Sequence, residues 1–524
     1  MALSKEQYKV FEDIVGPENI SDDPVILDGG HSGPTGFSAG FYLQRPPAVI
    51  LPGSTEDVQA IMKAINRYGL QANVSSSGWG CLSGTNALSK DMIVLDMRRM
   101  NRILEIDEKN MCAVVEPYVS AGQLQGVLEK LGFSAHCTGA GPTQSVLASA
   151  AAFGGMGFDS IFMSYSGRNV LGVEWVTPTG EVARIGSRGS GQGWFYPDSP
   201  GVSVWGTLRG GFGTSAGLGV FTKCATKIYP WPGEGEEHTG VSPTYLVEKY
   251  PEKLKAYYLA FPSYERMAEA VYKISEANIG YMLNRIWGAA LPFVVADSND
   301  EVWALLQTGV FQERCKYGFA FSLGAFSSRE IEYQEKTLMK ILEETEGDTI
   351  DDLLDLTPAG RSRLYYHLSW NAGSVAAVFK AAGAFLAGVS YIDTTDACID
   401  GTKIATEVKK EYGEKGVLLD DGDACWGVAY EGGVLSGLHT EQIWQWDPSE
   451  AESVAGCFDY MVSSIKPWAD RGFTLFWGGK MGPFAELYGP AATDYQMWLK
   501  RIKREFDPKA VANPFFYTAI AAEE

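Results

Sequence analysis

The chain has 524 residues, of which 45% are hydrophobic, 12% aromatic and 20% charged, so it is long enough for two domains and has the composition of a folded protein. Its formal net charge of −21 disfavours nucleic acid as a partner, because this charge repels a phosphate backbone. The N-terminus mixes charges and no apolar run approaches the ~20 residues of a membrane span, so we expect a cytoplasmic protein without membrane contact.

The first predicted elements form a strand, helix and strand between residues 48 and 74. The letters AVIL predict a short strand that begins at Ala48. Ser54-x-x-Asp57 has the spacing of a helix capping box, and apolar residues recur at helical spacing after it. Gly69 is suited to end this helix in a left-handed conformation.

Further strands and one helix are predicted between residues 91 and 134. The letters MIVLDM, ILEID and CAVVEPYVS are typical of strands. A helix is predicted over residues 121–131, with one apolar face made by Leu124, Val127, Leu128 and Leu131.

Three segments rich in small residues lie next to predicted strands. They are SSSGWGCLSGTN (75–86), GAGPTQSVLASAAAFGGMG (139–157) and RGGFGTSAGLG (209–219), and a hairpin with its turn at Thr179-Gly180 precedes the third. Glycine lets a backbone approach a ligand closely. We therefore interpret the three segments as contacts to one large ligand, against the alternative that each is an ordinary turn.

From about Glu237 the pattern changes to longer helices mixed with short strands, which indicates a second domain. Near the end, DYQMWLKRIKREFDPKAVANPF predicts a basic amphipathic helix that stops at Asp507-Pro508 and packs back on the first domain. The predicted domains are residues 1–236, residues 237–490 and a returning tail of residues 491–524.

The short motifs exclude several kinds of site. Gly78, Gly80 and Gly84 form GxGxxxG, which is not the Rossmann fingerprint GxGxxG, although backbone N–H groups there can still hold a pyrophosphate. Residues 213–217 match GxSxG, but a serine hydrolase needs an apolar strand before this motif and a helix after it. No P-loop, CxxC pair or HExxH motif occurs, so we predict no metal site.

The quoted segments resemble a known family when they are taken together. The run PAVILPGSTEDVQAIMKAINRYGLQANVSSSGWGCLSGTN, the letters GPTQSVLASAAAFGGMGF, the strand GFGTSAGLGVFTK and the closing DPKAVANP are similar to the vanillyl alcohol oxidase and 4-cresol dehydrogenase family of FAD-linked oxidoreductases. The resemblance covers about the first 230 residues and the tail. It implies an α+β fold, with a bipartite PCMH-type FAD-binding domain of two α+β subdomains and a cap domain of antiparallel sheet and helices.

The resemblance also implies a cofactor and a reaction. The cofactor is FAD, and the reaction is hydride transfer to flavin N5 from a small, largely apolar or aromatic alcohol or activated C–H substrate. The electron acceptor is dioxygen or a separate acceptor protein. The resemblance also implies that this chain forms a homodimer or other homo-oligomer. Two alternatives stay open, namely a redox-neutral flavoenzyme of the alkyl-dihydroxyacetonephosphate synthase type and a flavin-binding protein without turnover.

The site residues follow from the same resemblance, position by position. Those implied to bind the cofactor are Ser75, Ser77, Gly78, Gly80, Ser83, Thr85, Gly141, Pro142, Thr143, Ser145, Gly155, Gly213 and Val220, with His439 as a candidate covalent link to the flavin. The catalytic candidates are Asp159, Tyr165 and Arg168. Phe476 and Trp477 stand where phenol-oxidising members have a Tyr-Arg pair. Neither side chain can neutralise a phenolate, so an apolar substrate body is expected against them.

Overall fold

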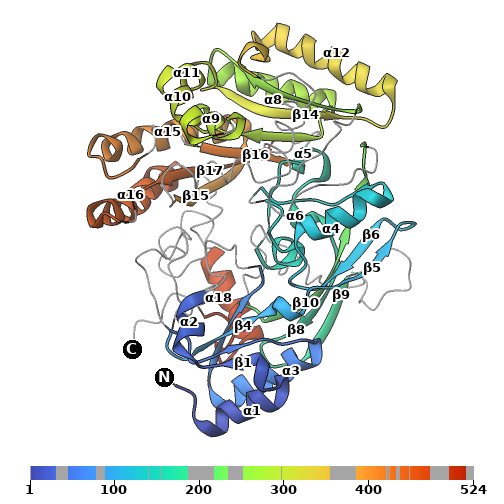
Figure 1. Cartoon of the computed structure of the whole chain (residues 1–524), viewed down its shortest axis with the longest axis vertical. Coiled ribbons are helices and arrows are strands. Elements are labelled where there is room, and N and C mark those ends of the chain that lie inside the picture. The colour runs from blue at the N-terminus through green and yellow to red at the C-terminus, as the bar shows by residue number, and fades with distance from the viewer. Residues whose placement is uncertain are drawn as a thin grey trace.

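The computed structural model describes residues 2–30, 45–77, 89–139, 141–153, 155–186, 217–233, 252–296, 298–354, 385–419, 423, 425–431, 437–447, 449–471 and 495–514. These residues form two bodies, and Figure 1 shows one above the other. The lower body runs from α1 to β11 and includes α18, and the upper body runs from β12 to α16. The mixture of helices with separate sheets confirms the predicted α+β fold class.

Two sheets form most of the lower body. One has the order β1-β2-β4-β3, with β2, β4 and β3 parallel, and the other is an antiparallel sheet of order β5-β6-β10-β8-β9. β7 and β11 form a separate pair. The strands are β1 (Ile20–Ser21), β2 (Val49–Ile50), β3 (Gln71–Ser75), β4 (Met92–Asp96), β5 (Ile103–Asp107), β6 (Cys112–Val115), β7 (Phe133–Ser134), β8 (Val170–Val176), β9 (Val182–Gly186), β10 (Val220–Lys227) and β11 (Tyr229–Pro230).

The helices of the lower body cover these sheets. They are α1 (Lys5–Val15), α2 (Pro24–Gly30), α3 (Thr55–Tyr68), α4 (Ala121–Leu128), α5 (Ser160–Met163), α6 (Ser166–Asn169) and α18 (Tyr495–Phe506). α3 has the predicted ends, because the Ser54 hydroxyl accepts the Asp57 N–H and Gly69 is left-handed with φ +65°. The Asp57 carboxylate accepts the Gly53 N–H at 2.8 Å. In a full capping box it would accept the N–H of the N-cap residue, Ser54, which is one residue later.

Two local predictions were wrong in part. α4 ends at Leu128 and passes into a 3₁₀ turn over Glu129–Leu131. Leu124 and Leu128 are buried, whereas Val127 and Leu131 are each 41% exposed, so the buried face of the helix is narrower than predicted. The second small-residue segment is not an ordinary turn throughout, because it contains one π-helical turn, Ala148–Phe153.

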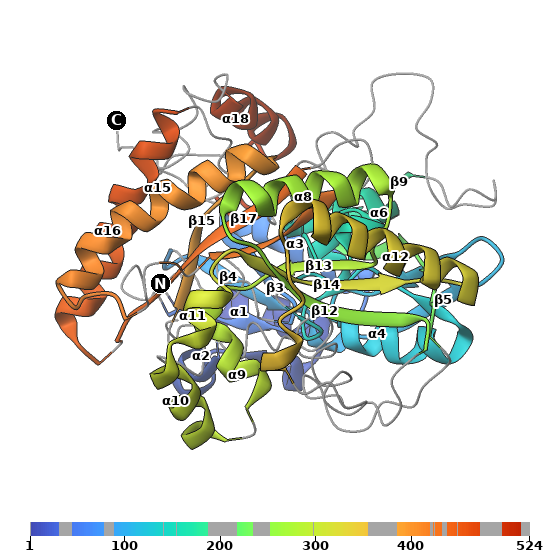
Figure 2. The same cartoon turned by 90° about the horizontal axis from the view of Figure 1, so that it is seen from above.

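The upper body is one antiparallel sheet of order β12-β14-β13-β16-β17-β15. Its strands are β12 (Leu254–Ala260), β13 (Met282–Arg285), β14 (Gly318–Gly324), β15 (Phe385–Thr394), β16 (Cys425–Glu431) and β17 (Gly437–Gln445), and its helices are α8 (Tyr264–Ala277), α9 (Leu291–Val295), α10 (Asn299–Thr308), α11 (Val310–Arg314), α12 (Ser328–Thr345), α15 (Thr395–Glu414) and α16 (Ala451–Ala469). Figure 2 shows α8, α12 and α15 lying over one face of this sheet. The other face points toward the lower body (Figure 1).

The C-terminal tail returns to the lower body. Ala72 of β3 donates its N–H to the Val511 carbonyl at 2.7 Å and accepts the Asn513 N–H at 2.8 Å. The buried Lys503 ammonium of α18 donates to the Gly217 carbonyl. Residues more than 280 positions apart along the chain are thus joined within the lower body, where Figure 1 shows α18 near α2 and β4.

In the described part of the chain, no helix combines the length and the apolar character that a membrane crossing requires.

Candidate functional site

The first and second small-residue segments meet at a hydrogen bond. Ser75 is the last residue of β3, at the carboxyl edge of the parallel strands, and it is buried. Two residues later the Ser77 hydroxyl accepts the backbone N–H of Ser145 at 3.1 Å. Ligands of open α/β sheets bind outside the carboxyl ends of their strands, so the meeting point lies where such a ligand is expected.

The second segment turns back on itself before it reaches Ser145. Gly141 has φ +98°, which favours glycine, and its N–H donates to the Thr138 carbonyl at 2.9 Å. Pro142 accepts the Gly122 N–H at 2.8 Å, and Thr143 is partly exposed. The segment therefore offers a backbone surface with a hydroxyl at its edge.

Gly155 closes the same segment against α6. Its N–H donates to the Ser149 carbonyl at 2.7 Å, and its carbonyl accepts the Ser166 N–H at 2.8 Å. A Cβ at this position would overlap the Thr138 methyl group. Gly155 and Thr138 can lie this close because residue 155 has no side chain.

Val220, the first residue of β10 and the one directly after the third segment, lies in the interior of the lower body. It is 2% exposed and pairs with Val176 of β8. It packs in a core with residues of the parallel sheet, including Ile50 and Leu95. Val220 thus belongs to the antiparallel sheet and packs against the parallel one.

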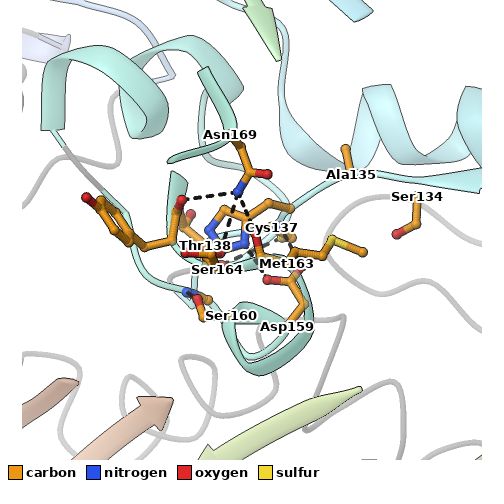
Figure 3. Close-up of polar contacts among 12 residues, drawn as sticks. Ser134, Ala135, Cys137, Thr138, Asp159, Ser160, Met163, Ser164 and Asn169 are labelled. Carbon is orange, nitrogen blue, oxygen red and sulfur yellow. Dashed lines mark hydrogen bonds and ion pairs between the residues drawn. The ribbon is translucent and has the colours of Figure 1, made fainter. Parts of the chain in front are cut away.

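Asp159 is buried, and each of its carboxylate oxygens lies next to a neighbouring residue. Oδ2 accepts the Cys137 N–H at 2.8 Å, and Oδ1 contacts Nδ1 of His136. Figure 3 shows Asp159 beside Cys137 and Thr138 at the start of the second segment. Burial, strengthened by the nearby Asp159 carboxylate, raises the pKa of the Cys137 thiol.

The two other catalytic candidates are neighbours, Tyr165 on the turn from α5 to α6 and Arg168 within α6. Tyr165 is half-buried and packs against the core of the upper body. The exposed Arg168 has its guanidinium carbon 5.6 Å from the centre of the Tyr165 ring. Such a distance allows a cation–π interaction, so the two side chains form one unit.

His439 lies on β17, in the upper body, and is 1% exposed. Its Nε2 lies 2.9 Å from Glu441 Oε1, and its ring meets the Trp426 ring edge-on at 5.6 Å. Trp426 in turn contacts Phe158 at 5.9 Å between ring centres. His439 is therefore connected to Phe158, the residue after the second segment, through the Trp426 ring.

The remaining predicted residues, Gly78, Gly80, Ser83, Thr85, Gly213, Phe476 and Trp477, lie outside the described residues.

Sequence reasoning missed three polar groups of this region. The His136 ring and the Ser166 hydroxyl are buried, and neither His136 Nε2 nor Ser166 Oγ has a hydrogen-bond partner within the described residues. Both residues, with the buried Asn169, line a cavity of about 10 Å³, room for a single water molecule. The one sequence signal was the position of His136, three residues before the second segment begins.

The described residues contain no group of three or more His, Cys, Asp and Glu side chains that could hold a metal ion.

Residues 46–186 match the protein family described as "FAD binding domain". The chain contains an FAD binding domain. This match spans both meeting segments, from Ser75 to Gly155, and the three catalytic candidates. It confirms FAD as the cofactor inferred from the sequence.

Comparison with known sequences finds FAD-linked and flavoprotein relatives over part of the chain. The FAD-linked oxidoreductase Rv2280 of Mycobacterium tuberculosis is 28% identical over 225 residues, which cover 42% of this chain and 45% of that protein. The 4-cresol dehydrogenase flavoprotein subunit of Pseudomonas putida is 27% identical over 201 residues, 36% of each chain. The matched segments span less than half the length of these relatives.

Solved structures match the whole fold. A p-cresol methylhydroxylase structure superposes with a TM-score of 0.77 at 14% identity, covering 98% of this chain and 96% of that one. The 4-ethylphenol oxidase of Gulosibacter chungangensis has a TM-score of 0.74 at 18% identity and covers 98% of both chains. The architecture of an FAD-binding part with a sheet-and-helix cap is therefore confirmed, and we call the upper body the cap from here on.

Proposed function

We propose that this protein is an FAD-dependent oxidoreductase that takes a hydride from a small, largely apolar or aromatic alcohol or activated C–H substrate. The observation that carries the proposal is the match of residues 46–186 to the FAD binding domain family. The FAD-linked names of the relatives and the shared fold of two phenol-oxidising proteins add support.

The residues present fit a long, doubly phosphorylated cofactor. Ser77 lies at the carboxyl edge of the parallel strands, where its hydroxyl meets the main chain of Ser145, and the left-handed Gly141 lies in the turn just before this meeting point. Bound FAD would supply the hydride acceptor, which no protein side chain can. The proposed cofactor residues are those of the sequence analysis, with the first and second segments around the phosphates and ribityl chain.

We also propose a role for each of the three parts of the chain that the sequence predicts. Residues 1–236 would hold most of the cofactor, residues 237–490 would cover the substrate, and residues 491–524 would complete the cofactor domain. The bonds of Ala72 to Val511 and Asn513 support this assignment of the tail.

Tyr165 is the catalytic residue that we favour. It lies on the turn from α5 to α6 of the FAD binding domain and packs against the core of the cap, whereas Asp159 is buried in contact with Cys137 and His136. Arg168 would then stabilise negative charge near the Tyr165 ring. Phe476 and Trp477 are proposed to contact the apolar body of the substrate.

An absorbance spectrum before and after acid precipitation tests the cofactor assignment. Purified protein is expected to show flavin bands, and their release to the supernatant means non-covalent FAD. Flavin that stays in the pellet, and is lost from it in His439→Ala, would identify His439 as the covalent link. Protein that is colourless and takes up no added FAD would contradict the proposal.

Anaerobic mixing with p-cresol, 4-ethylphenol and simple benzylic alcohols then tests the reaction. Bleaching of the flavin by one of these donors is expected for a dehydrogenase or oxidase. The alkyldihydroxyacetonephosphate synthase structure, with a TM-score of 0.62, represents the redox-neutral alternative. Turnover of a substrate without bleaching would favour that alternative.

A further inference from the structure

The turn that carries Tyr165 contains a strained residue. Ser164 ends α5 with φ +62° and ψ −178°, a backbone conformation that is almost confined to glycine. A serine stays there when its surroundings hold it in place. Strain of this kind clusters at sites where geometry is used for function.

The Asn169 side chain is hydrogen-bonded to the main chain of this turn. Its amide group donates to the Met163 carbonyl at 3.0 Å and to the Tyr165 carbonyl at 3.1 Å, with the Ser164 carbonyl 3.5 Å away (Figure 3). One side chain thus bonds to residues on both sides of Ser164. Asn169 is 1% exposed, so water does not compete for these carbonyls.

Tyr229 fixes the Asn169 amide in turn. Its hydroxyl donates to Asn169 Oδ1 at 2.6 Å from a position 60 residues away in the chain. Burial, with a smaller contribution from Asp159, raises the pKa of Tyr229 to about 12, so the phenol keeps its proton at neutral pH. The carbonyl oxygens of Met163 and Tyr165 can only accept, so the NH₂ group of Asn169 lies toward the turn and its Oδ1 accepts the Tyr229 hydroxyl.

The front of the turn is anchored as well. Asp159, at the start of α5, accepts the Cys137 N–H, and the Phe158 carbonyl accepts the Leu283 N–H of cap strand β13 at 2.8 Å. After the turn, the Ser166 N–H bonds to Gly155. The turn is thus tied to the second cofactor segment and to the cap, and Tyr165 is presented between them.

We propose that Asn169 is a positioning residue that holds the strained Ser164 turn and thereby fixes Tyr165 against the substrate. This inference rests on the proposed function, since it assumes that Tyr165 contacts a substrate beside bound FAD. Asn169 acts through the turn and touches no reacting atom. Tyr229 has the same role one bond further away.

Replacing Asn169 by alanine tests the inference. In Asn169→Ala, kcat per bound flavin is expected to fall about 100-fold, because a displacement of about 1 Å in a reacting group has that effect. KM changes much less, since the apolar contacts to the substrate remain. The probe is whichever of p-cresol, 4-ethylphenol or benzyl alcohol reduces the wild-type flavin.

Asn66 supplies a matched control. Its amide also donates to main-chain carbonyls, those of Met62 and Pro178, but at the hairpin end of α3, far from the turn in the chain. Asn66→Ala therefore removes a similar amide clamp and is expected to leave kcat per bound flavin unchanged. An equal loss of kcat in both variants would mean a general effect of destabilisation and would overturn the proposal.

Ser164→Gly separates positioning from stability. Glycine adopts the observed conformation without strain and leaves the Asn169 hydrogen bonds to the Met163 and Tyr165 carbonyls in place, so Tm is expected to rise while kcat per bound flavin stays within about twofold of the wild type. A fall of kcat in Ser164→Gly as large as that in Asn169→Ala would mean that the serine side chain, and not the Asn169 hydrogen bonds, fixes Tyr165. Such a result would contradict the inference.

Hydrogen–deuterium exchange gives a readout that does not need a substrate. Amides of residues 160–170 are expected to exchange faster in Asn169→Ala than in the wild type, and at the wild-type rate in Asn66→Ala. Unchanged exchange in Asn169→Ala would overturn the role of Asn169 whatever the enzyme does. If no donor reduces the wild-type flavin but exchange rises, the proposed reaction fails and the hold of Asn169 on the turn stands.

Discussion

Glu174 is a carboxylate inside the lower body that joins α3 to two strands. It is 1% exposed and lies 2.8 Å from both the Arg184 and the Lys223 side-chain nitrogens. The Thr55 hydroxyl of α3 donates to it at 2.6 Å. Burial alone would raise the pKa of Glu174, but the hydrogen bonds from Lys223, Thr55 and Arg184 outweigh it and lower the pKa to about 2.

This depressed pKa gives a stability contribution with a defined pH range. Because the folded pKa lies below the unfolded value near 4.5, the contribution is fully present above pH 4.5 and is lost as the pH falls toward about 2. Glu174→Gln is expected to lower the free energy of unfolding by about 2 kcal/mol at neutral pH. Urea denaturation should show this difference shrinking below about pH 4.5.

The exposed Glu181, in the same hairpin, serves as the control for Glu174. Glu181→Gln removes the same charge and is expected to change stability by less than about 0.5 kcal/mol. A difference for Glu174→Gln that is independent of pH down to about pH 3 would contradict the titration argument.

Among the elements, α18 is held by a buried ion pair. Lys503 Nζ lies 2.6 Å from Asp507 Oδ2 and also donates to the Gly217 and Ala512 carbonyls. Asp507 accepts the Val511 and Ala512 N–H groups at 2.9 Å each. Burial lowers the pKa of Lys503, but its partners are all oxygen atoms that favour the charged form.

Lys503→Met is therefore expected to lower the free energy of unfolding by about 3–5 kcal/mol, because it leaves the Asp507 carboxylate buried without a cation. Arg504→Met, at an exposed position of the same helix, changes the net charge equally and should cost less than about 0.5 kcal/mol. Thermal unfolding of the two variants compares them directly. Equal effects would mean that the buried pair does not hold the tail.

Local signals predicted the elements whose ends are set by their own neighbours. Ser54 and Gly69 bound α3 because capping and a left-handed glycine act within one turn of helix. The contacts of the candidate site could not be predicted in this way. Asp159 meets His136 after a loop and a π-helical turn, and the clamp on Asn169 comes from a different strand pair. Their partners are fixed by tertiary packing, which the sequence pattern does not encode at that distance.

At the scale of the whole molecule, the cap and the FAD binding domain share one interior. The hydrophobic core of the cap includes Met156 at the end of the second segment, Phe158 just after it and Met163 of α5. Phe158 also packs on Trp426 of cap strand β16. Because this contact is apolar and continuous with the cap core, we expect the two bodies to unfold together.

Gly139, where the second segment begins, tests this coupling. A Cβ there would overlap the six-membered ring of Trp426. Gly139→Ala is therefore expected to push the indole away from Phe158 and to lower the free energy of unfolding by about 1–3 kcal/mol. It should also split the single unfolding transition, because the cap loses its packing on the second segment.

Gly126, in the interior of α4, has no atom within 4 Å of an added Cβ. Gly126→Ala should raise stability by about 0.5–1 kcal/mol, because alanine favours the helix and nothing obstructs it. Differential scanning calorimetry of both variants measures the sign of each effect and the number of transitions. A gain in stability for Gly139→Ala would show that Trp426 moves aside without cost, and that the cap is coupled to the FAD binding domain elsewhere.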